Sequence, residues 1–327
     1  MTGAFVGTVA AERDPGYRSG FAALIGRPNA GKSTLTNALV GEKVAITSSR
    51  PQTTRHTIRG IIHRPDAQLV LVDTPGVHRP RTLLGERLND LVRETLLQVD
   101  VIGFCIPADE PVGPGDRFIA NELIELATGP DGRVRKNAPK VVVIVTKIDK
   151  LSDKGRREEL PAQLLAASAL VPDADVIPVS AVSGSQVGEL ADLLISKLPE
   201  GPPLYPDGEL TDEPERVMIA ELIREAALEG VRDELPHSLA VLVEDMEPRD
   251  GRPDHDPLLD VRAFIFVERD SQKGIMIGKR GARLREVGIE ARRNIEALLG
   301  QRVHLELRVK VAKDWQRDPK QLQRLGF

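Results

Sequence analysis

Cysteine and long apolar runs are scarce in this sequence, and both absences narrow what the protein can be. The one cysteine among its 327 residues, Cys105, excludes an internal disulfide bond and favours a reducing compartment. It lies inside the apolar run 101–106, so we expect it in the protein core. No window approaches the roughly 20 apolar residues that a membrane-spanning helix needs. Glu12, Arg13 and Asp14 interrupt the N-terminal segment before the apolar core of a signal peptide can form, so we expect no cleaved leader.

The net charge of −4 conceals an uneven distribution of charge along the chain. Residues 262–327 contain 16 Lys and Arg against 8 Asp and Glu, a net charge of +8, so the remainder carries −12. A basic end on an acidic protein favours a polyanionic partner for that end. A solvated surface of mixed charge explains the same counts about equally well.

The length predicts two domains, and the pattern of apolar segments predicts the first. From residue 19 to 198, short apolar runs alternate with helical patterns, which is typical of a doubly wound α/β fold with a mainly parallel sheet. We expect strands at 21–25, 57–63, 68–72, 101–106, 140–145 and 176–179, and helices at 32–40, 83–98, 116–127, 154–169 and 187–198. Residues 1–18 are predicted to be a flexible tail, and 128–139 a surface loop.

A segment rich in proline, glycine and acidic residues, 199–214, is predicted to be a linker. The second domain, 215–327, is predicted to be a smaller α+β unit. Its predicted order is helix, strand, strand, helix, helix, strand. The strands are expected at 239–246, 261–267 and 303–311, with a hairpin loop at 247–256 and the long helix at 282–299.

Residues 26–33 fit the phosphate-loop pattern, in which two glycines separated by four residues precede Lys and Ser. Glycines let successive backbone N–H groups surround a phosphate chain beside a helix N-terminus. Lys32 would reach the outer phosphates, and the Ser33 hydroxyl would ligate Mg²⁺. An ordinary glycine turn is the alternative, which the filled pattern and its position between a strand and a helix disfavour. The predicted nucleotide-binding residues here are Gly26, Arg27, Pro28, Asn29, Ala30, Gly31, Lys32, Ser33 and Thr34.

Two further segments predict the remainder of the phosphate and metal site. The sequence Asp73-Thr74-Pro75-Gly76, followed by Val77, closes the apolar run 69–72, so Asp73 can hold the hydration shell of Mg²⁺ and the Gly76 N–H can meet a terminal phosphate. The polar stretch 48–56 is typical of a loop that a γ-phosphate and its metal order through one threonine hydroxyl. We favour Thr54 over Thr53 for this ligand, and the sequence leaves the choice open.

The sequence Thr146-Lys147-Ile148-Asp149 follows the apolar run 141–145 and predicts the base site. The Asp149 carboxylate can accept from the ring N–H and the exocyclic amine of guanine, which adenine does not offer in that arrangement. Lys147 would lie along the base plane. Ser180 and Ala181, after the run 176–179, would support the guanine carbonyl through a backbone N–H.

These segments together resemble the translation-factor-related GTPases over residues 19–198. The resemblance implies GTP hydrolysis with Lys32, Thr54, Gly76 and Asn29 as catalytic residues. Thr146 departs from the usual Asn of the base-reading motif, and its hydroxyl can make part of the same contacts. Val77 stands where Ras-like enzymes have the glutamine that orients water, so slow intrinsic hydrolysis is expected. In relatives with Asn at the position of Asn29, this residue helps to hold K⁺, and K⁺ stimulation is therefore a hypothesis here.

A glycine–Lys–Arg–glycine loop lies in the second domain, and its predicted RNA-binding residues are Ile275, Ile277, Gly278, Lys279, Arg280 and Gly281. Glycines let the backbone approach a sugar-phosphate strand, and the isoleucines would line a groove for unstacked bases. A turn between two helices explains the loop alone about as well. The order of elements and the basic end favour RNA.

The second domain resembles a type II KH domain. Its combination with the first domain, with the sequence 52–56 and with Tyr205-Pro206 ahead of Thr211-Asp212, resembles the bacterial Era family of GTPases. The resemblance implies binding near the 3′ end of small-subunit ribosomal RNA, assembly of the small ribosomal subunit, and a cytoplasmic monomer loosely associated with the inner face of the membrane. The alternatives are a switch whose second domain binds a protein or acidic lipid, and a tRNA-modifying GTPase, although no modification domain is found.

Overall fold

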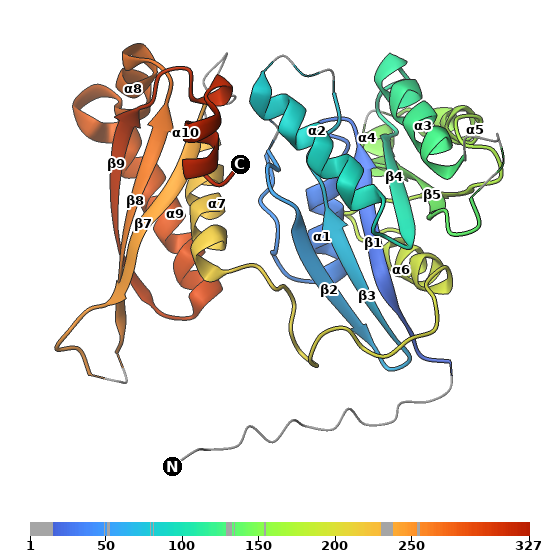
Figure 1. The fold of residues 1–327 in the computed structure, drawn as a ribbon, viewed down its shortest axis with the longest axis horizontal. Helices are drawn as coiled ribbons and strands as arrows, with labels where there is room; N and C mark the ends of the chain where they lie inside the picture. Colours follow the sequence, from blue (N-terminus) through green and yellow to red (C-terminus); the bar gives the residue numbers. More distant parts are fainter. Residues whose placement is uncertain are drawn as a thin grey trace.

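The structure is a computed structural model that describes residues 16–48, 50, 53–78, 80, 82–128, 133, 135–153, 155–229, 238–253 and 256–327. It contains two sheets, each with its own helices, in two units that lie side by side (Figure 1). Most of the predicted tail, 1–15, lies outside the described residues. Tyr17 is buried and Arg18 begins the first strand, so that strand starts three residues earlier than predicted.

The larger sheet has six strands in the order β2-β3-β1-β4-β5-β6. Only β2 is antiparallel to its neighbour, β3. The strands are β1 (Arg18–Gly26), β2 (Ile58–Arg64), β3 (Ala67–Asp73), β4 (Val101–Pro107), β5 (Lys140–Thr146) and β6 (Asp175–Pro178). Because β1 lies between β3 and β4, the chain order reverses at its carboxyl end, which is where open α/β sheets bind ligands.

Helices cover both faces of this sheet, because alternate residues of each strand point to opposite faces. The helices of this unit are α1 (Lys32–Val40), α2 (Leu83–Leu96), α3 (Pro114–Ala127), α4 (Ile148–Asp153), α5 (Leu160–Ser168) and α6 (Val187–Ser196), with a short 3₁₀ turn η1 (Arg157–Glu159). Leu24 packs with α1 and α6, whereas its neighbour Ile25 packs with α2, α3 and α5 on the other face. This arrangement confirms the predicted doubly wound, mainly parallel α/β fold.

The helix predicted over 154–169 is wrong in its first half. The described chain has the turn η1 and begins α5 only at Leu160, with Pro161 in its first turn. Proline lacks a backbone N–H and suits the first turn of a helix, but it breaks a helix interior. The apolar pattern of α5 was therefore extended too far towards the N-terminus.

The second unit confirms the predicted order of elements in a smaller α+β domain. It contains α7 (Glu215–Leu228), β7 (Ala240–Pro248), β8 (Leu258–Val267), α8 (Asp270–Ile277), a 3₁₀ turn η2 (Lys279–Gly281), α9 (Ala282–Leu299) and β9 (Arg302–Val311). Strand β8 is central, antiparallel to β7 and parallel to β9. Helices α7, α8 and α9 bury one face of this sheet.

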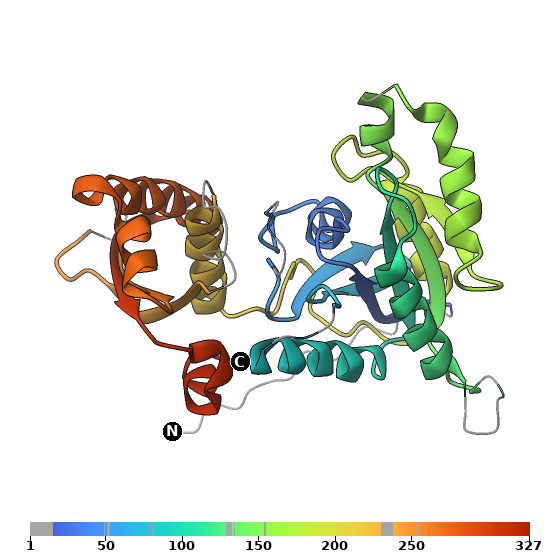
Figure 2. The same cartoon turned by 90° about the horizontal axis from the view of Figure 1, so that it is seen from above.

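The C-terminal residues form a turn and a helix that the sequence analysis did not predict, η3 (Trp315–Arg317) and α10 (Pro319–Arg324). They cover the second face of the small sheet, where Trp315 and Leu322 pack with Leu84 and Leu88 of α2. Figure 2 shows the C-terminus at the start of α2, so this segment joins the two units. Among the described residues, no helix is long and apolar enough to cross a membrane.

Candidate nucleotide and RNA sites

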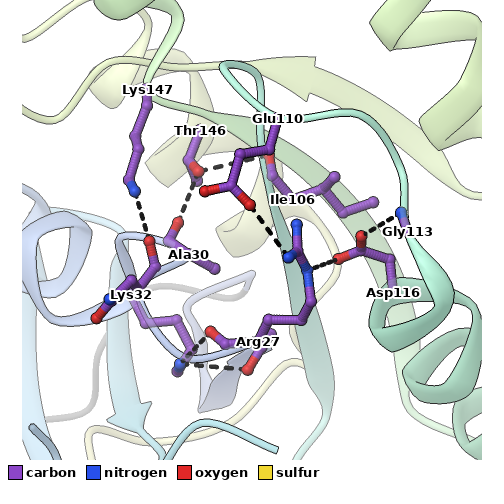
Figure 3. Close-up of polar contacts among 11 residues, drawn as sticks. Arg27, Ala30, Lys32, Ile106, Glu110, Gly113, Asp116, Thr146 and Lys147 are labelled. Carbon is purple, nitrogen blue, oxygen red and sulfur yellow. Dashed lines mark hydrogen bonds and ion pairs between the residues drawn. The ribbon is translucent and has the colours of Figure 1, made fainter. Parts of the chain in front are cut away.

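The predicted phosphate loop connects β1 to α1 at the carboxyl edge of the larger sheet. Asn29 and Gly31 both have positive φ, 62° and 90°, so the loop turns sharply before the helix begins. The Lys32 side chain is 6% exposed and its Nζ donates to the backbone carbonyls of Gly26 and Arg27, 3.3 Å away in each case (Figure 3). Burial lowers the pKa of Lys32, and Asp73 opposes that shift. The ammonium therefore lies within the loop, where it can reach a bound phosphate.

Three side-chain oxygens, those of Ser33, Thr54 and Asp73, meet beside the start of α1 and form the cluster named the metal-side cluster below. The Ser33 hydroxyl donates to Asp73 Oδ2 at 2.6 Å and lies 2.9 Å from the Thr54 hydroxyl, which is itself 3.3 Å from the same carboxylate oxygen. Thr53 points elsewhere, since its hydroxyl donates to the Arg50 carbonyl at 2.7 Å. The structure thus places Thr54, and not Thr53, in this cluster.

This cluster fits a hard divalent cation such as Mg²⁺. Asp73 is fully buried, and its second oxygen, Oδ1, has no hydrogen-bond partner among the residues that the structure describes. Burial raises the pKa of Asp73, although Lys32 and the hydroxyls of Ser33 and Thr54 oppose the shift. A buried carboxylate with an unpaired oxygen beside two hydroxyls provides the oxygen ligands that Mg²⁺ prefers.

The segment after β3 packs directly against the phosphate loop. A Cβ atom at Gly76 would lie 2.8 Å from the Pro28 Cα, so only glycine allows this approach. The Val77 N–H donates to the Gly26 carbonyl at 3.2 Å, and the Val77 side chain packs against the core. Thr74 donates to the Leu24 carbonyl at 2.7 Å, which fixes the turn at the strand end. Val77 therefore offers no polar group to an attacking water.

The predicted base-reading motif begins at Thr146, the last residue of β5, and is hydrogen-bonded to the phosphate loop. Thr146 Oγ1 donates to the Ala30 carbonyl at 2.6 Å, and Lys147 Nζ donates to the Asn29 carbonyl at 2.5 Å (Figure 3). Ser180 donates its hydroxyl proton to Asp149 Oδ1 at 2.6 Å. The carboxylate predicted to read guanine is thereby held by the residue that was predicted to support the guanine carbonyl.

One cavity of about 520 Å³ joins these segments. The predicted residues that line it are Pro28, Asn29, Gly31, Lys32, Ser33, Thr34, Thr54, Gly76, Thr146, Lys147, Asp149 and Ala181. The other predicted nucleotide residues are not among the residues that line it: Gly26, Arg27, Ala30, Asp73, Thr74, Pro75, Val77 and Ser180. The lining residues that were not predicted are Leu35, Ile46, Thr47, Asp109, Glu110, Lys150, Val179 and Val182. The position of Asp109 and Glu110 just after β4, at the same sheet edge, was the available signal.

Cys105 lies in the buried strand β4 and confirms the expectation of a core residue. Burial raises the pKa of its thiol to about 12, so the reactive thiolate is suppressed at neutral pH.

The predicted RNA loop joins α8 to α9 in a conformation that depends on glycine. Gly278 and Gly281 have φ of 72° and 79°, and a Cβ at Gly278 would lie 2.6 Å from the Arg283 Cβ. Lys279 and Arg280 are exposed at the turn. The loop thus presents two cations and little side-chain bulk to its surroundings.

A groove of about 350 Å³ begins at Gly281 and runs between α9 and β9. It is lined by Gly281, Leu284, Arg285, Gly288, Ile289, Arg292, His304, Leu305 and Leu307. The two isoleucines predicted to line a groove lie elsewhere, because Ile277 packs against the core and Ile275 is 59% exposed on α8.

Comparisons with known proteins identify the family to which both units of the chain belong. A family model described as 50S ribosome-binding GTPase matches residues 21–147, and a model described as KH domain matches residues 234–316. The chain is 65% identical over 312 residues to GTPase Era of Streptomyces coelicolor, covering 95% of each chain. The chain belongs to the Era family of GTPases. It is also 65% identical over 314 residues to GTPase Era of Mycobacterium avium, covering 95% of this chain and 99% of the relative.

Two solved Era structures share the whole architecture. One, described as Era in complex with MgGDPNP and nucleotides 1506–1542 of 16S ribosomal RNA, is 37% identical with a TM-score of 0.86 and covers 94% of this chain and 98% of its own. A variant of Aquifex aeolicus Era bound to GDP·AlF4⁻ is 36% identical with a TM-score of 0.82 and covers 94% and 99%. The predicted GTPase activity and the presence of a KH domain are therefore confirmed at the level of the family.

Proposed function

We propose that this protein is a GTP-hydrolysing switch that binds small-subunit ribosomal RNA near its 3′ end and acts in assembly of the small ribosomal subunit. Residues 19–198 would form the GTPase domain, 199–214 the linker and 215–327 the KH domain. The support is the pair of sites described above, together with an Era relative whose structure holds both MgGDPNP and the 16S ribosomal RNA nucleotides. In this proposal GTP occupancy controls how the KH domain holds RNA.

The observation that carries the proposal is that one loop contacts both the metal-side cluster and the KH domain. Thr54 lies 2.9 Å from the Ser33 hydroxyl, while the preceding carbonyl, that of Thr53, accepts a hydrogen bond from Arg224 of α7. The next side chain, Arg55, donates to the Leu239 carbonyl at 2.6 Å. A γ-phosphate that fixes Thr54 would therefore fix contacts to the second domain as well.

Aromatic rings of the C-terminal segment surround the Arg55 guanidinium. Its Cζ lies 5.6 Å from the Trp315 ring centroid and 6.0 Å from that of Phe327, and His56 stacks on Phe327 with centroids 4.9 Å apart. A buried guanidinium is costly unless it is paired, and these rings and the Leu239 carbonyl offset that cost. The interface is thus specific, and its loss on hydrolysis would release the KH domain.

A second contact connects the nucleotide cavity to α7. Glu225 accepts from the Thr47 N–H at 2.9 Å and pairs with Lys43. Thr47 itself lines the cavity. Two separate parts of the nucleotide site, 46–48 and 53–55, therefore contact the KH domain, which supports energetic coupling between the two sites.

The chemistry of this site is electrostatic. Lys32 and the Gly76 N–H would stabilise charge that develops on the terminal phosphate oxygens as water attacks. Ser33, Thr54 and Asp73 would hold Mg²⁺, which neutralises charge between the outer phosphates when it is bound. Val77 cannot orient the water, so the proposal keeps slow intrinsic turnover that a partner surface accelerates.

The proposal includes K⁺ as a second cofactor that Asn29 helps to hold. Asn29 is exposed at the mouth of the cavity, with its backbone fixed by the bond from Lys147. Turnover in K⁺ is expected to exceed turnover in Na⁺ at equal ionic strength. Equal rates in the two salts would remove K⁺ from the mechanism.

RNA would bind along the groove that begins at Gly281. Lys279 and Arg280 would contact the sugar-phosphate backbone, while Ile289 and Leu305 provide apolar surface for unstacked bases. Lys279→Asp combined with Arg280→Asp is expected to weaken RNA binding strongly. Unchanged RNA affinity would instead favour a protein or acidic lipid partner.

We further propose a cytoplasmic monomer that associates loosely with the inner membrane face, for which the +8 charge of 262–327 is the physical support. Co-sedimentation with vesicles of anionic lipid, compared with neutral lipid, tests the membrane part.

The decisive experiment measures binding of a labelled single-stranded oligonucleotide from the 3′ end of small-subunit ribosomal RNA, with a GTP analogue or GDP. A scrambled oligonucleotide is the control. Tight, sequence-dependent binding that the GTP analogue favours is the expected result. Equal weak binding to both oligonucleotides would contradict the RNA part of the proposal and leave the GTPase part standing.

A further inference from the structure

The Arg27 side chain leaves the phosphate loop and lies against the start of α3. Its Nε donates to Asp116 Oδ1 at 2.7 Å, and its Nη1 donates to Glu110 Oε2 at 3.1 Å (Figure 3). Arg27 Nε thus reaches a helix that contributes none of the residues lining the nucleotide cavity, whereas Glu110 is one of the lining residues.

The two carboxylates differ in what they contribute. Asp116 is fully buried, and its second oxygen accepts from the Gly113 N–H at 2.9 Å, so its position is fixed by the beginning of α3. The Glu110 side chain is 53% exposed, and exposed ion pairs contribute little. Breaking a buried pair leaves an uncompensated charge, so the bond to Asp116 is the stronger anchor.

The backbone carbonyl of Arg27 accepts two hydrogen bonds from within the phosphate loop. Its carbonyl accepts from the Ala30 N–H at 3.2 Å, which closes the turn, and from Lys32 Nζ at 3.3 Å. The side chain is confined at Gly115, where a Cβ atom would lie 2.7 Å from the Arg27 Cδ. A fixed side chain therefore fixes the orientation of the carbonyl on which the turn and the lysine depend.

We infer that Arg27 is a positioning residue, anchored by Asp116, which holds the phosphate loop in the conformation that binds the diphosphate of a guanine nucleotide. The inference rests on the proposed nucleotide site. Its specific consequence is that Arg27 acts on the phosphates and not on the base. Removal of the contact between Arg27 and Asp116 weakens the binding of nucleotides and leaves the binding of the nucleoside unchanged.

The test measures affinities of the full chain for GDP, a GTP analogue and guanosine by competition against a fluorescent GDP. Arg27→Met, which keeps the apolar stem, and Asp116→Asn are expected to lose about tenfold or more for both nucleotides, as for loss of a charge-assisted hydrogen bond. Guanosine affinity is expected to change less than twofold. Arg27→Lys, which retains the charge, is expected to recover part of the loss.

Gly115→Ala is the second variant, because it displaces Arg27 while every charge stays and helix propensity improves. It is expected to reproduce the selective loss of GDP affinity while the affinity for guanosine stays close to that of the wild type. Arg93→Met is the matched control, since Arg93 also pairs with a carboxylate of α3, Glu122 at 3.1 Å, away from the phosphate loop. Its nucleotide affinities should match the wild type.

The outcomes separate this inference from the proposed site. A wild-type chain that fails to bind GDP contradicts the site itself. If the wild type binds while Arg27→Met and Gly115→Ala bind GDP equally well, the positioning inference is overturned. Equal losses for GDP and guanosine also overturn it, because they indicate general support of the fold.

Discussion

Arg224 of α7 donates a hydrogen bond to the backbone carbonyl of Thr53, one residue before the hydroxyl of Thr54 in the metal-side cluster. The same guanidinium forms a buried, two-point contact with Glu221, with Nε–Oε1 and Nη2–Oε2 distances of 2.9 Å and 2.6 Å. One arginine of the second unit therefore binds the backbone of the loop on which the proposed switch depends.

Replacing Arg224 with lysine tests this connection while keeping a positive charge beside Glu221. Lysine cannot reproduce the planar, two-point geometry and still reach the Thr53 carbonyl. We expect GTP hydrolysis to persist, and the ratio of RNA affinities between the GTP-analogue and GDP states to shrink several-fold. Fluorescence titration in both states measures the ratio. Arg216→Lys, on the same helix but bonded to carbonyls of β7, should leave the ratio intact.

The ion pair between Glu221 and Arg224 predicts how the free energy of unfolding depends on pH in acid. Burial alone would raise the pKa of Glu221, but Arg224 outweighs it, with help from His56 and Arg55, and holds the pKa below its usual 4.5. A depressed carboxylate pKa stabilises the fold above the unfolded value, and that stabilisation is lost as pH falls through the folded value. We expect the contribution of this pair to be constant from pH 5 to 7 and to decline below about 4.5.

Urea unfolding of wild type and Glu221→Gln between pH 3.5 and 7 measures this prediction. As the pH falls, the free energy of unfolding should decrease more steeply for the wild type than for the variant. The difference between the two slopes should correspond to at most one bound proton. Identical slopes would show that Glu221 titrates alike in the folded and unfolded chains. Glu94, an exposed carboxylate in α2, provides the control as Glu94→Gln.

The sequence predicted the elements wherever local signals determine them. Both α1 and α9 have the predicted bounds, and each is preceded and followed by a glycine with positive φ, as at Gly31 and Gly41. The metal-side cluster was also predictable, because residues at the carboxyl ends of neighbouring strands meet at one edge. Helix α10 was missed although Asp318 caps it ahead of Pro319, a recognisable start signal.

Contacts between the two units could not be predicted. Arg55 meets Leu239 across 184 residues, and no periodicity within either segment records that pairing. The approach of 46–48 to the cavity has the same origin, since Ile46 packs into the core of the KH domain. The groove between α9 and β9 likewise depends on tertiary packing, which places residues distant in sequence on its two sides.

Gln68, a buried side chain of β3, makes three hydrogen bonds to the segment 199–214, which is also bonded to the larger sheet by Ser19 and Ile61. Gln68 Oε1 accepts from the N–H groups of Leu204 and Tyr205 at 2.6 Å and 2.9 Å, and its amide donates to the Tyr205 carbonyl at 2.9 Å. Replacement of Gln68 with leucine keeps the side-chain volume and removes all three hydrogen bonds to this segment.

For Gln68→Leu we expect a loss of about 1–3 kcal/mol in unfolding free energy and faster proteolytic cleavage within 199–214. His63→Ala, which removes one bond to the Glu209 carbonyl, should be far milder. Equal cleavage rates for Gln68→Leu and wild type would contradict this role.

Thr146 has one hydroxyl proton, and its shorter contact is with the Ala30 carbonyl at 2.6 Å, while the Ile106 carbonyl lies 3.4 Å away. The hydroxyl therefore ties the base-reading motif to the phosphate loop, so its removal should weaken both halves of the nucleotide site together. Thr146→Val preserves shape and leaves the buried carbonyl without this donor, which costs about 1–3 kcal/mol. We expect GDP and GTP-analogue affinities to fall by a similar factor of about ten, and guanosine affinity to fall as well, unlike in Arg27→Met.

Thr146→Ser retains the donor and should bind GDP nearly as the wild type does. If Thr146→Ser and Thr146→Val were equally impaired, the methyl group and its packing would be the important feature of Thr146, and the hydrogen bond to Ala30 would not determine affinity.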